Sequence, residues 1–129
     1  MTTRRFTLSK EERLSWKRHI DLLFAKGRAF VAFPLRVVFL SMDESLSTRA
    51  AILVSISKKK FKHAVDRNHV KRQVREAYRL RKYNLLDTLE TNNKSILIAF
   101  IYLDKEIYPY TTIEKAMSKA IRTLREKIA

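Results

Sequence analysis

The stretch DRNHVKRQVREAYRL, from Asp66 to Leu80, decides the fold because it joins a basic surface to an apolar stripe. Val70, Val74 and Ala77 recur at helical spacing and fall within about 60° of one another on a helical wheel. A disordered basic tail would need no such stripe. The segment therefore predicts an amphipathic helix, with Asp66 as its expected N-cap, that docks its apolar side on a sheet.

The basic side chains of this helix fall on a separate arc. Its expected members are Asn68, Lys71, Arg72, Arg75, Arg79 and Lys82. From Lys58 to Lys82 there are eleven Lys and Arg against two acids, so this part carries +9 of the chain's +15. A run of charge on a helix is usually a solvated face, but such faces interleave Glu with Lys. Because arginine suits bidentate phosphate contact, the pattern favours a nucleic-acid surface.

The composition agrees with a folded, polyanion-binding protein. The 129 residues fit one domain spanning 1–129, and 46% hydrophobic residues exclude intrinsic disorder. The net charge of +15 predicts a nucleic-acid partner, with an anionic membrane surface as the weaker alternative. The absence of cysteine excludes disulfides and thiolate zinc sites. The start of the chain lacks the apolar run of a signal peptide, and the longest apolar run, ILIAFIYL, is too short to span a bilayer, so we expect a cytoplasmic protein.

Helices are expected at both ends of the chain. Ser9 and Glu12 form a capping box, and the only glycine, Gly27, is placed to end the first helix as a left-handed cap. A second box, Thr111 with Glu114, is expected to start the last helix. The apolar stripes of the two helices are Trp16, Ile20, Leu23 and Phe24, and Ile113, Met117, Ala120, Ile121, Leu124 and Ile128.

Strands are expected between these helices. Residues 30–40 are rich in branched and aromatic side chains, and Pro34 marks an edge, a bulge or a break between two strand pieces. In residues 50–57, Ile52, Val54 and Ile56 face one way. Residues 88–94 are expected to be a loop, and residues 95–103 a central strand. The prediction is an α+β fold in the order α-β-β-β-α-β-α, with one mixed sheet covered by helices mainly on one face.

The segment SISKKKFKHAVDRNHVKRQVREAYR, residues 55–79, resembles the signature of the bacterial ribonuclease P protein subunit. RLSWKRHIDLLFAKGRAF, residues 13–30, is similar to the opening helix of that family. Two departures stand out. The family's signature contains an Arg-Asn-Arg triplet, and here His69 stands at its third position. The signature also has a glycine after Ser-Lys-Lys, which this sequence lacks.

The resemblance implies a ribonucleoprotein in which the RNA subunit hydrolyses precursor tRNA and holds the magnesium ions. The protein would have no catalytic residue and no metal or cofactor of its own, and the helix between parallel strands would make a left-handed crossover. Asp104 and Glu106 are then interpreted as turn residues. The implied RNA-subunit-binding residues are Lys58, Lys59, Lys60, Lys62, Arg67, Asn68, His69, Lys71, Arg72, Arg75 and Arg79.

The resemblance also implies a cleft for the single-stranded 5′ leader of precursor tRNA, between the first helix and the sheet. The expected trough consists of Ile20, Phe24, Val37, Phe39, Ser55 and Ser57, edged by Lys58 and Lys59. In the competing interpretation, Phe24 and Phe39 simply fill the core.

Three other functions compete with this one. A ribosomal or other rRNA-binding protein would share the charge and the fold. A helix-turn-helix DNA regulator needs two helices joined by a short turn, where this chain has a strand and a basic loop. A nuclease acting without RNA would need clustered carboxylates to hold cations, and His19, His63 and His69 show no metal spacing.

Overall fold

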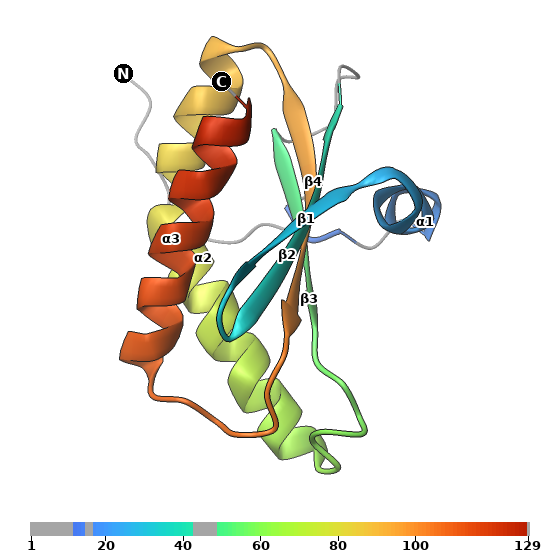
Figure 1. Cartoon of the computed structure of the whole chain (residues 1–129), viewed down its shortest axis with the longest axis vertical. Coiled ribbons are helices and arrows are strands. Elements are labelled where there is room, and N and C mark those ends of the chain that lie inside the picture. Colours follow the sequence, from blue (N-terminus) through green and yellow to red (C-terminus); the bar gives the residue numbers. More distant parts are fainter. Residues whose placement is uncertain (1–11, 15–16, 43–48, 129) are drawn as a thin grey trace.

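Four strands form one mixed sheet that has helices on both faces (Figure 1). The computed structural model describes residues 12–14, 17–42 and 49–128. The strands lie in the order β1-β2-β4-β3; β1, β2 and β4 are antiparallel neighbours, and β3 is parallel to β4. The elements are α1 (Lys17–Lys26), β1 (Arg28–Ala32), β2 (Leu35–Met42), β3 (Ala50–Ser55), α2 (Ala64–Thr91), β4 (Ser95–Tyr102) and α3 (Tyr110–Ile128). The predicted α+β class and element order are confirmed.

The larger core lies between the sheet and the pair α2 and α3. The alternation predicted for β3 is confirmed, because Ile52, Val54 and Ile56 all face this core. The apolar stripe of α2 packs here, and Tyr78 meets the ring of Phe100 with centroids 6.0 Å apart. The stripe predicted for α3 is also buried at every described position. The β3-α2-β4 connection joins parallel neighbours, and its left hand remains a prediction from the resemblance.

The opposite face of the sheet is only partly covered, by α1 over β2 and β4. Leu23 of α1 is fully buried here against the odd-numbered side of β4, so the prediction of a central strand that is apolar on both faces is confirmed. One row across this face is less covered. We call it the open row: Val31 of β1, Arg36 of β2, Ile101 of β4 and Ser55 of β3, each paired with the next in register.

Residues 12–14, which precede α1, pair with the sheet instead of forming part of the predicted helix. The Leu14 amide donates to the Ile52 carbonyl over 2.6 Å, and the Ile52 amide donates to the Glu12 carbonyl over 2.8 Å. Residues 12–14 thus lie along the outer edge of β3, with Arg13 opposite Ile52. The helix predicted to follow the capping box begins only at Lys17, while Ser9 and Trp16 lie outside the described residues.

The predicted boundaries of α2 were wrong at both ends. His63, with extended backbone, precedes the helix, so Asp66 lies inside the first turn. A carboxylate there interacts favourably with the helix dipole and stabilises the helix. The helix continues to Thr91, and the loop expected over residues 88–94 shrinks to its last three residues. Asn93 there adopts a φ of 51°, the left-handed conformation that asparagine tolerates.

The Thr111 capping box was also wrong, because α3 begins at Tyr110, two residues before the start that this box predicts. Pro109 ends the preceding loop, and its carbonyl accepts a hydrogen bond from the Thr112 amide over 3.0 Å. Glu114 is bound to Arg81 of α2 and does not reach back to the start of its own helix. Of the edge, bulge or break expected at Pro34, the structure shows the break, since β1 ends at Ala32 and β2 begins at Leu35. Within the described residues, no helix is long and apolar enough to cross a membrane.

Gly27 does end α1, but for a different reason from the one predicted, since its φ is not positive. Its amide donates to the Leu23 carbonyl over 2.8 Å. A Cβ at this position would lie 2.3 Å from the Leu23 oxygen, and 3.1 Å from both the Phe39 oxygen and the Val38 Cγ1. Glycine is therefore required chiefly because the chain turns back closely on the Leu23 carbonyl of α1, a backbone atom that cannot rotate away, and β2 leaves little extra room on the other side.

We expect Gly27→Ala to destabilise the protein by roughly 1–3 kcal/mol, because the added methyl group collides with the Leu23 carbonyl and distorts the end of α1. Urea denaturation monitored by circular dichroism would measure this loss. The neighbouring exposed Lys26→Ala serves as the control and should stay within about 0.5 kcal/mol of the unmodified protein. Equal stabilities of the two variants would contradict the clash with the Leu23 carbonyl as the reason for glycine.

Candidate nucleic-acid interface

The predicted cationic arc is present on α2, on the side of the helix away from the buried Val70 and Val74. We define the cationic arc as Asn68, Lys71, Arg72, Arg75 and Arg79, all exposed or half-buried. Arg75 has a lowered pKa, chiefly through desolvation and secondly through the nearby charge of Arg13. Arg13 therefore adds to the arc from the segment paired with β3. Sequence reasoning missed it because no local pattern indicates that pairing.

Arg79 contributes less net charge than its neighbours on the arc. Its Nε and Nη2 atoms donate to Glu76 over 2.6 and 2.5 Å, an i, i+3 pair. The hydrogen bond with Glu76 is the main reason that the pKa of Arg79 is raised. The pair fixes the direction of the guanidinium, while Arg72 of the same arc remains exposed.

Arg67 and His69 do not lie on the arc itself. The Arg67 Nη1 donates to the carbonyls of Phe61 and Lys62 over 2.7 and 3.0 Å, so this side chain fastens the basic loop to the start of α2. His69 is exposed and lies about 90° around the helix from the middle of the arc. Any contact that it makes with RNA must therefore come from a different direction.

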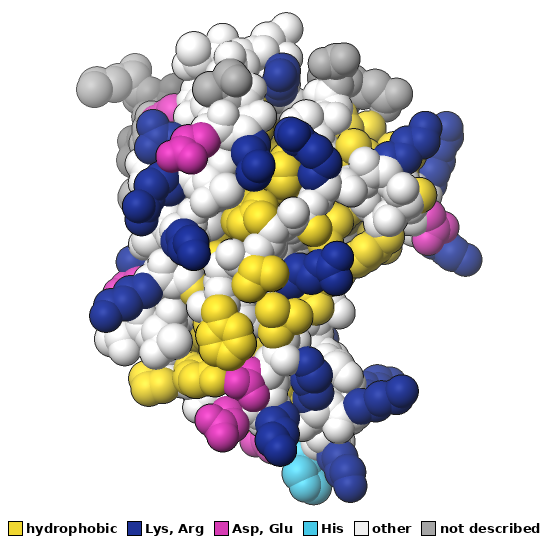
Figure 2. Space-filling view, viewed as in Figure 1, with side chains coloured by type: hydrophobic (Ala, Val, Ile, Leu, Met, Phe, Trp, Pro, Cys, Tyr) yellow, Lys and Arg dark blue, Asp and Glu magenta, His cyan; other side chains and the backbone are white. Residues whose placement is uncertain are grey.

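The loop before α2 forms a second basic feature, which we call the lysine pocket. It has a volume of about 500 Å³, and its basic residues are Lys59, Lys60, Lys62, His63 and Lys105. Figure 2 shows Lys, Arg and His side chains, with some Asp and Glu among them, at the end of the molecule where this loop and the start of α2 lie. Lys60 is held by the Leu103 carbonyl. Lys105 comes from the loop between β4 and α3, so only the fold brings it to the other lysines.

Asp104 holds the loop that carries Lys105. Its Oδ1 accepts hydrogen bonds from the amides of Lys105 (2.6 Å) and Glu106 (3.4 Å), and its Oδ2 accepts one from the Tyr108 hydroxyl. The Tyr108 bond is the main cause of the lowered pKa of Asp104, and the same bond raises the pKa of Tyr108 to about 12. The interpretation of Asp104 as a turn residue is confirmed.

The predicted trough cannot form as described, because two of its members lie on the wrong face. Val37 and Phe39 are fully buried in the core beneath α2 and α3, while α1 and Ser55 lie on the other face. Phe39 is a core residue, in contact with Phe30 at 5.9 Å between ring centroids. The physical reason is the two-residue period of a strand: the β2 residues that face α1 are Val38 and Leu40.

The other predicted members of the trough do lie on the α1 face or at its edge. Phe24 is 49% exposed, so the competing interpretation of this residue as a core residue was wrong. Ile20 is half-buried against the smaller core, and Ser55 belongs to the open row. Ser57 follows β3, and its hydroxyl oxygen accepts a hydrogen bond from the Lys59 amide over 3.2 Å.

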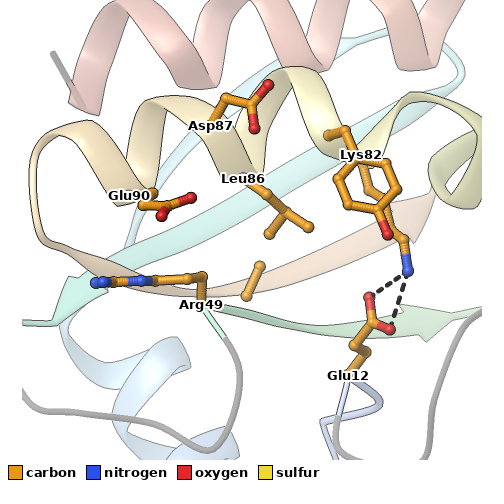
Figure 3. Close-up of a pocket in the computed structure, with 8 residues that line it drawn as sticks. Glu12, Arg49, Lys82, Leu86, Asp87 and Glu90 are labelled. Atoms are coloured by element: carbon orange, nitrogen blue, oxygen red, sulfur yellow. Dashed lines mark hydrogen bonds and ion pairs between the residues drawn. The ribbon is translucent and has the colours of Figure 1, made fainter. Parts of the chain in front are cut away.

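Lys82 was expected on the cationic arc, but it is buried and faces Glu12. Its Nζ lies 2.8 and 3.0 Å from the two Glu12 oxygens, as Figure 3 shows. The pair lies in a pocket of about 320 Å³ whose other charged lining residues are Arg49, Asp87 and Glu90. The mixed charge of this pocket does not match a phosphate surface. Its ion pair instead ties the segment before α1 to the middle of α2.

Comparisons with known proteins identify consistent relatives. The family model Ribonuclease P matches residues 8–125. The chain is 45% identical over 116 residues to a ribonuclease P protein component from Porphyromonas gingivalis, covering 90% of this chain and 85% of that protein. It is 29% identical over 129 residues to one from Chlorobium phaeobacteroides, covering 92% and 88%. The solved RNase P protein from Thermotoga maritima superposes with a TM-score of 0.69 at 22% identity, covering 87% of this chain and 96% of that one.

We expect Lys82→Ala to destabilise the protein by roughly 3–5 kcal/mol, since it leaves the Glu12 carboxylate without its buried cationic partner. Thermal melts and urea titrations would measure the loss. The exposed Lys62→Ala is the matched control and should change stability little. Replacing both partners with Leu should recover most of the stability, and a double variant as unstable as Lys82→Ala would argue against the pair as the cause.

Proposed function

This chain belongs to the ribonuclease P protein family, and from that membership we propose that it is the protein subunit of a ribonuclease P ribonucleoprotein. In this role it binds the RNA subunit and the 5′ leader of precursor tRNA in the bacterial cytoplasm, and supports removal of the leader. The RNA subunit carries the catalysis and the magnesium ions. The protein contributes no catalytic residue; it supplies positive charge and a surface for single-stranded RNA.

The observation that carries this proposal is the adjacency of the cationic arc and the lysine pocket. Both are built on α2 and the loop before it, and Arg67 fastens that loop to the helix. A rigid helix holds the arginines at fixed spacing, as repeated contacts with an RNA backbone require. The assembled surface would displace condensed counterions, so binding should depend strongly on salt.

For the 5′ leader we propose the face of the sheet that α1 leaves partly open. Phe24 offers an exposed ring, beside Ile20, on which a leader base can stack, and Arg36 of the open row can contact the phosphate backbone of the leader. Stacking tolerates any base, as a variable leader requires. Val31, 53% exposed, and Ile101 extend the apolar floor. Arg36 and Ile101 thus take the place of Val37 and Phe39 in the predicted trough.

The direct test of the proposal is cleavage of precursor tRNA at low magnesium by the organism's own RNA subunit, with and without the protein. Cleavage that rises on adding the protein supports the proposal. A protein that binds the RNA subunit but never changes cleavage would be an RNA-binding protein of another kind, such as an rRNA-binding protein.

The double variant Arg72→Ala with Arg75→Ala should weaken binding to the RNA subunit by about ten-fold or more, since each substitution removes a charge-assisted contact with phosphate. The slope of log affinity against log salt should fall by about one for each lost contact. Filter binding at several salt concentrations measures both quantities. Lys127→Ala, an exposed change on α3, is the control. Equal losses in the double variant and the control would indicate diffuse charge without a defined surface.

Phe24→Ala should lower affinity for precursor tRNA relative to mature tRNA by roughly 5- to 150-fold, the range that corresponds to one lost stacking contact. Because Phe24 is 49% exposed, its loss should change stability by less than about 1 kcal/mol. The neighbouring Leu23→Ala, in the fully buried part of α1, should destabilise by about 2–5 kcal/mol without a selective effect on the leader. An unchanged precursor-to-mature ratio for Phe24→Ala would exclude this residue from leader binding.

A further inference from the structure

A groove between α2 and α3 gathers three arginines on the side of the helix pair away from the cationic arc. It is lined by Arg81, Asn84, Ser118, Ile121, Arg122 and Arg125 and has a volume of about 320 Å³; we call it the arginine groove. Two helices contribute to it, with Arg81 from α2 and Arg122 and Arg125 from α3. Figure 2 shows Lys and Arg side chains distributed along the part of the surface where α3 lies.

The three arginines differ in how they are held. Arg81 is committed: it pairs with Glu114 at 2.7 Å, and its Nε donates to the Ser118 hydroxyl over 2.9 Å. Arg125 is exposed, and its Nε donates to the hydroxyl of Thr88 over 3.2 Å. Arg122 is exposed and has no hydrogen bond or ion pair within the described part of the chain.

The charge around the groove favours an anion. Glu114, the acid beside it, is already bound by Arg81. Lys115 and Lys119 extend the positive surface along the outer side of α3, where Glu126 is the opposing acid. Arg122 and Arg125 therefore retain N–H groups that can donate hydrogen bonds to a phosphate, and the planar guanidinium is the group best suited to hold one.

The groove and the cationic arc lie on different sides of the same helix. Arg81 is about 135° around α2 from the middle of the arc, and α3 packs on the groove side. A helix with its side chains is roughly 10 Å wide, so a single strand would have to wrap around the helix layer to contact both sides.

We propose that the arginine groove binds the phosphate backbone of a second RNA segment, distinct from the segment that contacts the cationic arc. The inference rests on the proposed function, since it takes the RNA subunit as the partner. The pair α2 and α3 is then held between two parts of a folded RNA. The protein stabilises the arrangement of these parts by neutralising phosphates on both sides.

The test uses the full chain with the RNA subunit and the double variant Arg122→Gln with Arg125→Gln. Both residues are exposed, so the melting temperature should not change. Affinity for the RNA subunit should fall about five-fold or more, and the salt slope should fall by about one to two. Hydroxyl-radical footprinting should show lost protection at nucleotides other than those exposed by Arg72→Ala with Arg75→Ala. The charge-matched control is Lys26→Gln with Lys127→Gln, both exposed.

Each other result has a defined meaning. A groove variant that behaves like the control overturns the inference, and so does lost protection at the same nucleotides as for the arc variant. If the arc variant also leaves RNA binding unchanged, the proposed function fails first. Binding of the protein to phosphatidylserine vesicles that is lost in the groove variant, with RNA binding unchanged, would assign the groove to a membrane surface and overturn the RNA inference.

Discussion

The burial of one side of α2 against the sheet is the constraint on which the rest of the structure depends. Val70, Val74, Ala77 and Tyr78 are fully buried there, and this fixes the rotation of a helix of 28 residues about its own axis. Once that rotation is fixed, every other side chain of α2 has a set direction. The cationic arc points away from the sheet as a result. The same apolar burial also offsets the repulsion among the arc's positive charges, which opposes a compact fold.

Strand periodicity determined how much of the fold could be predicted. In part of the segment 50–57, apolar side chains alternate with small or polar ones. The prediction that Ile52, Val54 and Ile56 lie on one face of the sheet was correct. In β2 the four consecutive residues from Val37 to Leu40 are all apolar, so alternation cannot indicate which pair faces α1. The error over Val37 and Phe39 came from this lack of contrast. A strand segment that is apolar on both faces removes the signal by which its faces are assigned.

The features that sequence reasoning missed all depend on contacts between distant parts of the chain. Arg13 reaches the arc because residues 12–14 pair with β3, and Lys105 reaches the lysine pocket through a loop that Asp104 shapes. Lys82 has the helical position of an arc residue, but the partner that draws it inward, Glu12, lies 70 positions away. A helical wheel gives the direction of a side chain and carries no information about such a partner.

The acidic residues near α2 explain how so basic a helix can present selective surfaces. Glu76, Glu114 and Glu12 bind Arg79, Arg81 and Lys82 respectively, so each acid orients one cation within the described structure. Such pairs add little stability where they are exposed, and their main effect is to fix geometry. Arg72 and Arg122, which make no hydrogen bond or ion pair among the described residues, then carry charge that a polyanion can use. Positioning and recognition are thus divided between paired and unpaired cations on the same two helices.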